Sequence, residues 1–541
     1  MRRLQTATQQ YAWGKVGSKS KVAQLKKAEN PEYPVKEDVT YAELWMGTHP
    51  NGPSRVMKDG REGMSNLQGF GSQDGPGMFL IELLEMCPHY LGEMEELGDL
   101  PIMFKILSIN KALSIQAHPD KKLAERLYAT RPDLYKDDNH KPEMAVALSN
   151  FEGLCGFRPF HEIVSNIKHY PELRAMVGAQ ALGKALACEA GDKDAQKNAL
   201  KSLFEAFVTA SNELGTAKVK ELVVRLKTLR PILPRANSSY HSTTKPMVGL
   251  GLSKSMTDSQ DNVLGIGEVV TTEVPVVMQV DIGSEGTTDH EDQDPDPEHA
   301  DDDSSFSGNN LGPTSRGEAV KRWASKSSLD GYLQKQARWS EGYDQDHDQN
   351  KEDRLHDLIL RLAEEYPGDI GIMMPLLLNY LCMGPGESFF MAANEPHAYL
   401  KGDIMEVMAR SDNVVRVALT PKYRDVPLLC DILTYNMGAP PMVEPVRVDT
   451  FCKRYSPPIK DFELDDIMVP GGGEYSTISL PTASLGIVLE GRGSGCDGSS
   501  NQELWPGVVL FIPANTSVAI KSNGNTLLQL CIAHTNMHFD A

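Results

Sequence analysis

The sequence predicts a mainly β protein in which a helical domain and a long polar insertion interrupt the strands. Short apolar runs separated by Gly, Pro and Asn occur from Tyr11 to about Phe157 and again after Pro367, as in antiparallel sheets. Between these stretches, apolar residues recur with the spacing of amphipathic helices. A chain of 541 residues is also too long for one ordinary hydrophobic core. We therefore expect two or three domains.

The strand predictions follow the chain in two groups. The first stretch contains residues 80–84 and 101–108, which we interpret as strands. After Pro367 the pattern resumes in FFMAA, HAYL, IMEVMA and NVVRVAL, with turns at 384–386, 402–403 and 411–413. The carboxyl end repeats it in SLGIVLEG, GVVLFIPA, SVAIKS and TLLQLCIA. Apolar strands separated by short turns predict a β-sandwich or jelly roll there.

Three stripes with the spacing i, i+3, i+4 and i+7 predict helices in the middle of the chain. They are Leu200, Leu203, Phe204 and Phe207, then Val219, Leu222, Val223 and Leu226, and finally Leu355, Leu358, Ile359 and Leu362. Each apolar face needs a neighbour to cover it. The stripes therefore predict one small helical domain.

Residues 230–352 form a polar stretch with the tracts SSYHSTT, DHEDQDPDPEHADDD and YDQDHDQNKED. Low hydropathy and repulsion between like charges do not offset the entropy lost on ordering such a chain, so we predict disorder over most of it. The Val-rich residues 269–282 and a helix over 316–338 are the ordered pieces that we expect. A tolerated surface insertion is the preferred interpretation. A docking segment for a partner and a mispredicted coding segment are the alternatives.

The net charge of −20 has a local origin. Eleven acidic residues and no Lys or Arg lie between Asp281 and Asp303, so more than half of the net charge comes from the insertion. The acidic balance and the lack of a basic, aromatic surface pattern argue against nucleic-acid binding. The glycines at 471–473 precede a polar β segment, so we interpret them as a turn rather than a phosphate-binding loop.

Cysteine usage and hydropathy indicate the compartment. The eight cysteines include no CxxC pair, which argues against a thiolate zinc site or a disulfide framework and favours a reducing compartment. The amino terminus has no apolar core of a secretory signal. The most apolar run, residues 370–382, is interrupted by Pro375 and Asn379 and is too short to span a bilayer. We predict a cytoplasmic protein that does not bind a membrane.

Strand alternation predicts a face of ligand-type side chains in three runs. These are Ser114, Gln116 and His118 in KALSIQAHPD, Lys141 and Glu143 in HKPEM, and His397 and Tyr399 in PHAY. Two imidazoles, a carboxylate and an amide oxygen suit a four-coordinate zinc site. Spacing alone is more typical of an exposed polar face, and a single histidine is more often a hydrogen-bonded structural residue.

The same runs belong to a larger set of motifs that resembles the type I mannose-6-phosphate isomerase (phosphomannose isomerase) family. The set comprises YAWGKVGSKSKVAQL, YAELWMGTHPNGPS, LPIMFKILSINKALSIQAHPDKKLAERL, NHKPEMAVAL, FEGLCGFRP, YPGDIGIMMPLLLNY and NEPHAYLKGDIMEVMARSDNVVRVALTPKYRDV. The motifs occur in the order of the family. They cover nearly all of the chain outside the insertion.

The resemblance implies a cupin-type jelly-roll catalytic domain in two parts, residues 1–157 and 365–440, of which the second completes the zinc site. It implies a helical domain at 158–364 that contains the insertion at 230–352. A second jelly-roll domain is implied at the carboxyl end, residues 441–541.

The resemblance also implies one zinc ion per chain. The family's ligands fall on Gln116, His118, Glu143 and His397, and its catalytic arginine falls on Arg416. The implied reaction interconverts D-mannose 6-phosphate and D-fructose 6-phosphate by proton transfer through an enediol, feeding GDP-mannose synthesis and mannose catabolism. We expect a monomer that binds the phosphorylated hexose. The sequence does not identify a partner for the acidic insertion.

Further residues are candidates for the chemistry. Glu406 is the candidate base, and Lys141 is a candidate acid or base. The candidate contacts to the substrate are Ser114, Tyr399, Asp412 and Lys422. His140 is a candidate for assisting ring opening. A structural hydrogen-bonding role suits each of these residues nearly as well.

Two other functions fit the sequence. The first is a catalytically silent cupin that binds a sugar phosphate and uses the acidic insertion as an interaction surface. The second is an iron-dependent cupin oxygenase, although the Gln/His/Glu/His set lacks the His-rich strand motif usual there. An isomerase assay distinguishes the silent cupin from the isomerase, and metal analysis of the purified protein distinguishes the oxygenase.

Overall fold

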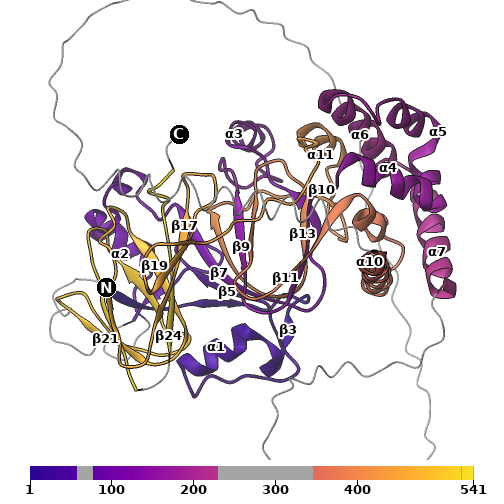
Figure 1. The fold of residues 1–541 in the computed structure, drawn as a ribbon. Coiled ribbons are helices and arrows are strands. Elements are labelled where there is room, and N and C mark those ends of the chain that lie inside the picture. The colour runs from indigo at the N-terminus through magenta and orange to yellow at the C-terminus, as the bar shows by residue number, and fades with distance from the viewer. Residues whose placement is uncertain (58–76, 230–344, 525–526, 540–541) are drawn as a thin grey trace, which may run out of the picture. The chain divides into compact units, whose positions relative to one another are not determined.

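The structure, a computed structural model, describes residues 1–57, 77–229, 345–524 and 527–539, which belong to one unit. Two large antiparallel sheets and a group of helices make up this unit (Figure 1). None of the described helices is long and apolar enough to cross a bilayer. The eight cysteines are free thiols.

The largest sheet has ten strands. Its main path runs β11 (Leu378–Met383), β10 (Phe151–Phe157), β13 (His397–Ala409), β7 (Ile102–Ile109), β5 (Glu43–Met46) and β2 (Ala7–Gln9). Beside this path lie β8 (Ile115–Ala117), β9 (Glu143–Ala147), β12 (Ser388–Met391) and β14 (Val415–Ala418). Strands β8 and β9 both pair with β13, while β14 pairs with β8 and β12 pairs with β9. The sheet therefore folds over into two layers.

Strand β13 belongs to both layers. Its first half pairs with β10 and β8, and its second half, from Gly402 onward, pairs with β7 and β9. Gly402 has a φ of 123°, and a Cβ atom there would lie 2.7 Å from the carbonyl oxygen of Asn150. Glycine lets the strand bend where a larger residue would clash. The prediction of two strands separated by a turn at 402–403 is therefore wrong, and one bent strand takes their place.

Alternation along β13 distributes its side chains among three cores. Ala398 and Leu400 pack in a core shared with the helices, and Met405 and Val407 pack in a core shared with the second large sheet. Tyr399 packs between the two layers. Every second side chain of β13 therefore points into the interior between the two layers, and these include the polar side chains of the motifs.

The second large sheet has eight strands. Their order is β15 (Val446–Arg447), β16 (Cys452–Tyr455), β17 (Glu463–Val469), β24 (Leu528–His534), β19 (Ser484–Glu490), β22 (Val509–Ile512), β1 (Arg2–Gln5) and β6 (Arg55–Val56). Three of the strands predicted near the carboxyl end are confirmed here as β19, β22 and β24, and the fourth, in SVAIKS, lies in the smaller sheet described next. Strand β1 joins them by pairing with β22. One face of this sheet, with Leu464 and Leu485, shares a core with Ile106 and Val407 of the first sheet.

A smaller sheet covers the other face of the second sheet. It consists of β18 (Glu474–Ser476), β23 (Ala519–Ser522), β20 (Gly493–Cys496) and β21 (Asn501–Leu504). Ile467 and Leu530 of the large sheet pack with Leu504 and Ile520 of the small one. The carboxyl-terminal strands therefore form a sandwich with a core of its own. Strands β3 (Lys15–Val16) and β4 (Thr40–Tyr41) form a separate pair.

The predicted helical stripes are confirmed. They lie on α6 (Lys193–Val208), α7 (Asn212–Leu229) and α10 (Gln345–Glu365), which share a core with α4 (Phe160–His169) and α5 (Pro171–Ala187). The same core includes Leu154 of β10 and Leu378 of β11, so the helices cover the outer face of one layer (Figure 1). The remaining helices are α1 (Lys21–Glu29), α2 (Leu80–Met86), α3 (Lys121–Thr130) and α11 (Val426–Ile432). Short 3-10 helices are η1 (Gly17–Lys19), η2 (Pro88–Leu91), η3 (Glu95–Leu97) and η4 (Ile370–Leu376).

Two predictions about secondary structure are corrected. Residues 80–84 belong to helix α2, not to a strand, because the Glu82 carboxylate accepts a hydrogen bond from the Phe79 N–H, as at a helix start. Leu80, Leu83 and Leu84 are buried at the helical spacing. The predicted disorder over 230–352 is also too long, since α10 begins at Gln345. The rest of that prediction, including the ordered pieces at 269–282 and 316–338, lies outside the described residues.

Candidate functional site

Strands β8, β9, β13 and β14 bring distant motif residues together. Gln116 of β8 is the register partner of His397 in β13 and of Arg416 in β14. Glu143 of β9 is the partner of Met408 in β13. Neighbours of these residues pack in the outer cores, so the motif side chains face the interior between the layers.

His118, Glu143 and His397 form a buried group that is able to hold a metal ion. One ligand atom of each lies within 4.8 Å of those of the other two, and each residue is 1% exposed. Glu143 Oε1 is 3.4 Å from His118 Nε2, and Glu143 Oε2 is 3.4 Å from His397 Nε2. His118 Nε2, Glu143 Oε2 and His397 Nε2 have no hydrogen-bond partner. Because buried polar atoms are nearly always satisfied, unpartnered atoms that converge in this way fit a cation.

Backbone carbonyls orient both imidazoles. His118 Nδ1 lies 2.7 Å from the carbonyl oxygen of Asn413, and His397 Nδ1 lies 3.0 Å from that of Glu395. A carbonyl oxygen only accepts, so each Nδ1 carries the proton and each Nε2 is left with its lone pair toward the group. This arrangement is the usual outer support of metal-binding histidines.

The charges of the group favour deprotonated ligands. Burial lowers the pKa of His118 to about 4, and the positive charge of Lys141 acts in the same direction. Burial alone would raise the pKa of Glu143, but Lys141 and His118 hold it well below its ordinary value. Lys141 Nζ lies 2.8 Å from Glu143 Oε1. His118 therefore presents a neutral imidazole, and Glu143 a carboxylate anion, at neutral pH.

Gln116 lies between the metal-binding group and Arg416. Its Oε1 atom accepts a hydrogen bond of 3.2 Å from the hydroxyl of Ser114. Ser114, Gln116 and His118 thus point to the same side of β8 and its flanking residues, as alternation predicts. The amide oxygen of Gln116 retains a second lone pair for another partner.

Arg416 is half-buried in β14. Burial lowers the pKa of Arg416 from its ordinary value, and no neighbouring charge of the described residues offsets this effect. A guanidinium remains charged in proteins and carries a fork of donors suited to phosphate. Arg416 is therefore a cation that is available to an anionic ligand.

Several buried charged side chains lie near the group formed by His118, Glu143 and His397. Glu406 accepts a hydrogen bond of 2.7 Å from the Tyr399 hydroxyl and forms an ion pair of 3.0 Å with Lys105. Lys105 also lies 3.7 Å from Glu43. Burial would lower the pKa of Lys105, but Glu406 and Glu43 outweigh it and raise the pKa above its ordinary value. Burial and the charge of Glu406 raise the pKa of Tyr399 well above its usual range.

Asp412 and Lys422 are more exposed than the other candidate residues. The hydrogen bond from His49 lowers the pKa of Asp412, and its carboxylate also accepts a bond of 3.2 Å from the Asn51 side chain. Lys422 is exposed in the segment after β14. Its backbone N–H donates to the Thr420 hydroxyl, and no contact joins its ammonium group to the described candidate residues.

Lys105, Glu43 and His49 are polar partners that sequence reasoning missed. Lys105 lies in the apolar run IMFKILSI, where a buried strand with one lysine indicates a paired charge. That signal was available, although it does not identify the partner. Glu43 contacts Lys105, and His49 contacts Asp412, because the fold brings residues distant in sequence together. The local sequence around Glu43 and His49 carries no comparable signal.

Comparisons with known proteins identify the family of the chain. The family model for the phosphomannose isomerase type I catalytic domain matches residues 1–160, and that for the helical insertion domain of the same family matches residues 329–378. Mannose-6-phosphate isomerase 1 of Arabidopsis thaliana is 31% identical over 100% of this chain and 95% of its own length. Mannose-6-phosphate isomerase of Mus musculus is 33% identical over 96% of this chain and 94% of its own length.

Solved structures share the fold. A phosphomannose isomerase variant from Salmonella typhimurium has a TM-score of 0.63 and 23% identity, with 99% of this chain and 100% of that chain covered. The identity to the curated relatives, over nearly the full length of both chains, decides the assignment. The chain belongs to the type I phosphomannose isomerase family, whose members are mannose-6-phosphate isomerases.

Proposed function

We propose that the chain interconverts D-mannose 6-phosphate and D-fructose 6-phosphate at the site around His118, Glu143 and His397. The observation that carries the proposal is the convergence of three buried ligand atoms that lack partners. The neighbouring Arg416, a half-buried cation without a counter-charge among the described residues, supports it. Membership of the family points to the same reaction.

One zinc ion is the proposed cofactor. His118, Glu143 and His397 would hold it, and the amide oxygen of Gln116 would be the fourth ligand. Imidazole and carboxylate are donors that zinc accepts readily. A solved mannose 6-phosphate isomerase bound with zinc and yttrium, with a TM-score of 0.63 and 22% identity, supports zinc as the metal. When bound, zinc polarises oxygen atoms without redox chemistry.

Glu406 is the proposed base that moves a proton between C1 and C2 through an enediol. Its carboxylate is 2% exposed and is held by the Tyr399 hydroxyl and the Lys105 ammonium. Both partners are donors, so they orient the carboxylate that exchanges the proton. Lys141, whose ammonium lies against Glu143, is the proposed acid for a sugar oxygen.

Arg416 is proposed to stabilise negative charge on the substrate, either on the phosphate or on the enediolate oxygens. Its planar donors match the oxygens of both groups. The hydroxyls of Ser114 and Tyr399, the carboxylate of Asp412 and the exposed ammonium of Lys422 are the proposed further contacts. His49 is proposed to hold Asp412 in place.

The finer assignments of the fold and setting are part of this proposal. They are a cupin-type jelly-roll catalytic domain at 1–157 and 365–440, a helical domain at 158–364, and a second jelly-roll domain at 441–541. The two layers of the ten-stranded sheet and the carboxyl-terminal sandwich support this division. A cytoplasmic monomer that supplies GDP-mannose synthesis and mannose catabolism is the proposed setting.

A coupled assay of the purified full chain with mannose 6-phosphate tests the function. We expect turnover that is lost on removal of the metal with a chelator and restored by zinc. Full activity in metal-free protein would overturn the zinc assignment. No isomerisation by protein that contains stoichiometric zinc would favour the silent sugar-phosphate-binding cupin, and tightly bound iron would favour the oxygenase.

A further inference from the structure

The carboxyl-terminal sandwich reaches the candidate active site through one loop. This loop, residues 456–462, connects β16 and β17, and we call it the Asp461 loop. Asp461 Oδ1 lies 2.7 Å from His140 Nε2. The two side chains are 24% and 27% exposed, so the contact is partly shielded from water. A residue of the loop between β16 and β17 therefore binds the residue that immediately precedes Lys141.

The segment that contains His140 is held from the other side as well. The Asn413 side chain donates to the carbonyl oxygens of Asp137 and Asn139, at 2.7 and 3.0 Å. The Ser411 hydroxyl lies 2.7 Å from the Asp137 carboxylate and 3.0 Å from the same Asn139 carbonyl oxygen. Residues 137–143, which include Lys141 and Glu143, thus lie between the loop before β14 and the Asp461 loop.

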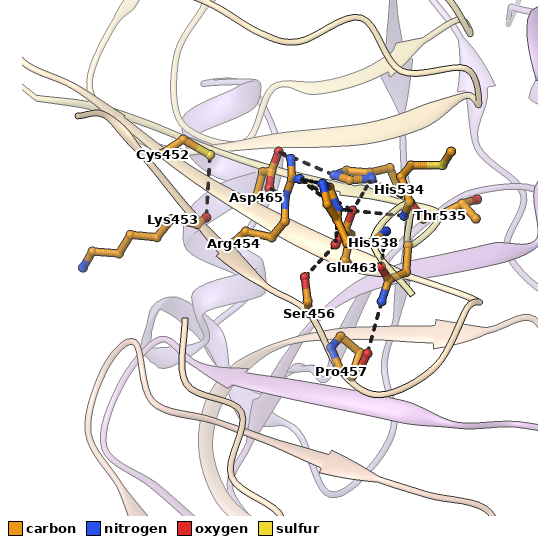
Figure 2. Close-up of polar contacts among 12 residues, drawn as sticks. Cys452, Lys453, Arg454, Ser456, Pro457, Glu463, Asp465, His534, Thr535 and His538 are labelled. Atoms are coloured by element: carbon orange, nitrogen blue, oxygen red, sulfur yellow. Dashed lines mark hydrogen bonds and ion pairs between the residues drawn. The ribbon is translucent and has the colours of Figure 1, made fainter. Parts of the chain in front are cut away.

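A network of buried polar groups anchors the start of the Asp461 loop (Figure 2). The Ser456 hydroxyl donates to Glu463 at 2.6 Å, and Glu463 is fully buried. Arg454 binds Asp465 through two hydrogen bonds of 2.6 and 2.8 Å on the strands that flank the loop. Bidentate pairs of this kind fix geometry as well as charge. The base of the loop is therefore rigidly attached to the sheet.

The middle and the end of the loop are also fixed. The Asn536 side chain donates to the carbonyl oxygens of Pro457 and Ile459, at 3.1 and 2.8 Å. Phe462, directly after Asp461, is fully buried in the core shared by the two large sheets. The loop is thus held on both sides of Asp461. The Asp461 carboxylate is therefore preorganised to contact His140.

We propose that Asp461 is a positioning residue of the active site. Through His140 it fixes the backbone that leads into Lys141 and Glu143, and so keeps the Lys141 ammonium in contact with Glu143. The carboxyl-terminal sandwich is then a structural part of the active site rather than an appended domain. This inference rests on the proposed function for its kinetic consequence, whereas the ordering of residues 137–143 can be measured without it.

The experiment compares Asp461→Ala, His140→Ala and the double variant in the full-length, zinc-loaded protein. A misplacement of about 1 Å caused by a change away from the reacting atoms can cost about 100-fold in rate, so we expect each single variant to lower kcat about tenfold. The double variant should be no worse than either single one, because both remove the same contact. Asp461→Asn retains an acceptor for His140 and should recover most of the activity.

Two further measurements separate positioning from general damage. Amide hydrogen exchange of peptides spanning 137–143 should accelerate in Asp461→Ala, while bound zinc and the midpoint of thermal unfolding stay close to those of the parent. The matched control is Glu474→Ala, which removes an exposed ion pair of 2.7 Å with Lys521 elsewhere in the sandwich. It should change neither kcat nor exchange at 137–143.

Each contrary outcome has a definite meaning. Unchanged kcat and unchanged exchange in Asp461→Ala would overturn the inference, as would additive losses in the double variant or an equal loss in the Glu474→Ala control. An inactive parent protein would refute the proposed function instead. The exchange measurement would then still decide whether Asp461 orders residues 137–143.

Discussion

The imidazole of His118 donates its Nδ1 proton to the carbonyl oxygen of Asn413 across 2.7 Å. The Asn413 side chain, in turn, holds the carbonyl oxygens of Asp137 and Asn139. One residue of the segment before β14 therefore orients the proposed metal ligand that follows β8 and also the approach to Glu143 in β9. Asn413 is 1% exposed, so these hydrogen bonds are shielded from water.

Replacing Asn413 with Asp should weaken metal binding. The substitution keeps the shape but replaces the amide donor with an acceptor that faces the carbonyl of Asp137. Changes to such outer contacts typically cost about 10-fold to 100-fold in metal affinity. Competition for zinc with a chromophoric chelator measures the effect, and an affinity equal to that of the parent would contradict the role of Asn413.

Substitutions of His397 and Arg416 should have different effects on metal binding and on turnover. His397→Ala removes an unpartnered buried nitrogen of the group and should lose both zinc and activity. Arg416→Ala should retain zinc and lose turnover, because the arginine touches none of the three ligand side chains in the described structure. Metal analysis beside a kinetic assay distinguishes the two. Normal turnover by Arg416→Ala would remove it from the site.

Lys105→Met should destabilise the fold. Lys105 is the cation between Glu406 and Glu43, and removal of one partner from a buried ion pair costs about 3–5 kcal/mol. In the double variant Lys105→Met/Glu406→Gln, only one buried carboxylate is left without its cation instead of two. This variant should therefore recover part of the lost stability. Urea unfolding of the zinc-loaded proteins gives the comparison. Equal midpoints for the parent and Lys105→Met would show that the pair is not stabilising.

Asp465 should make the free energy of unfolding depend on pH in the acidic range. Although burial raises its pKa, Arg454 and His534 outweigh burial and lower it from 3.8 to about 2. The unfolded chain binds this proton more readily, so the contribution is fully present above about pH 4 and is lost as the pH falls toward 2. The Asp465→Asn variant should be less stable by about 2 kcal/mol at pH 7. The difference should shrink in unfolding experiments below pH 4, and a constant difference would contradict the assignment.

Two deletions should differ in their effect on stability. A variant in which a Gly/Ser linker replaces residues 233–343 leaves helix α10 intact, whereas deletion of 230–352 removes its beginning. The longer deletion also removes Glu352, whose carboxylate lies 3.5 Å from both His169 and His356. We expect thermal unfolding at the parent temperature for the shorter deletion and at a lower temperature for the longer one. The same midpoint for both would contradict a role for the first turns of α10.

Sequence reasoning predicted the strands and the three buried helical stripes because their patterns are local. Alternation in SIQAH is enough to place Gln116 and His118 on one side of β8. The helix at Leu80–Met86 was missed although its leucines have helical spacing, since a short apolar run fits either structure. The bend at Gly402 was read as a turn because the close approach of Asn150 is a contact between distant residues.

The ligand set came from family motifs rather than from spacing, and the structure explains why spacing was insufficient. All of residues 158–364 lie between Glu143 and His397 in the sequence, yet their carboxylate and imidazole are 3.4 Å apart. Nothing local to either residue encodes that distance. The partners Lys105, His49 and Asp461 are of the same kind, since each acts on the site through a strand or loop remote in sequence.

The pairing of β1 with β22 also has a consequence for synthesis on the ribosome. Arg2 is the register partner of Phe511, so this pairing forms only after residue 511 has been translated, whereas β6, the other partner of β1, is made much earlier. Contacts between residues so far apart close late and slow folding. Until then, the edge of β1 that β22 covers in the folded protein is unpaired, and unpaired strand edges are prone to aggregation.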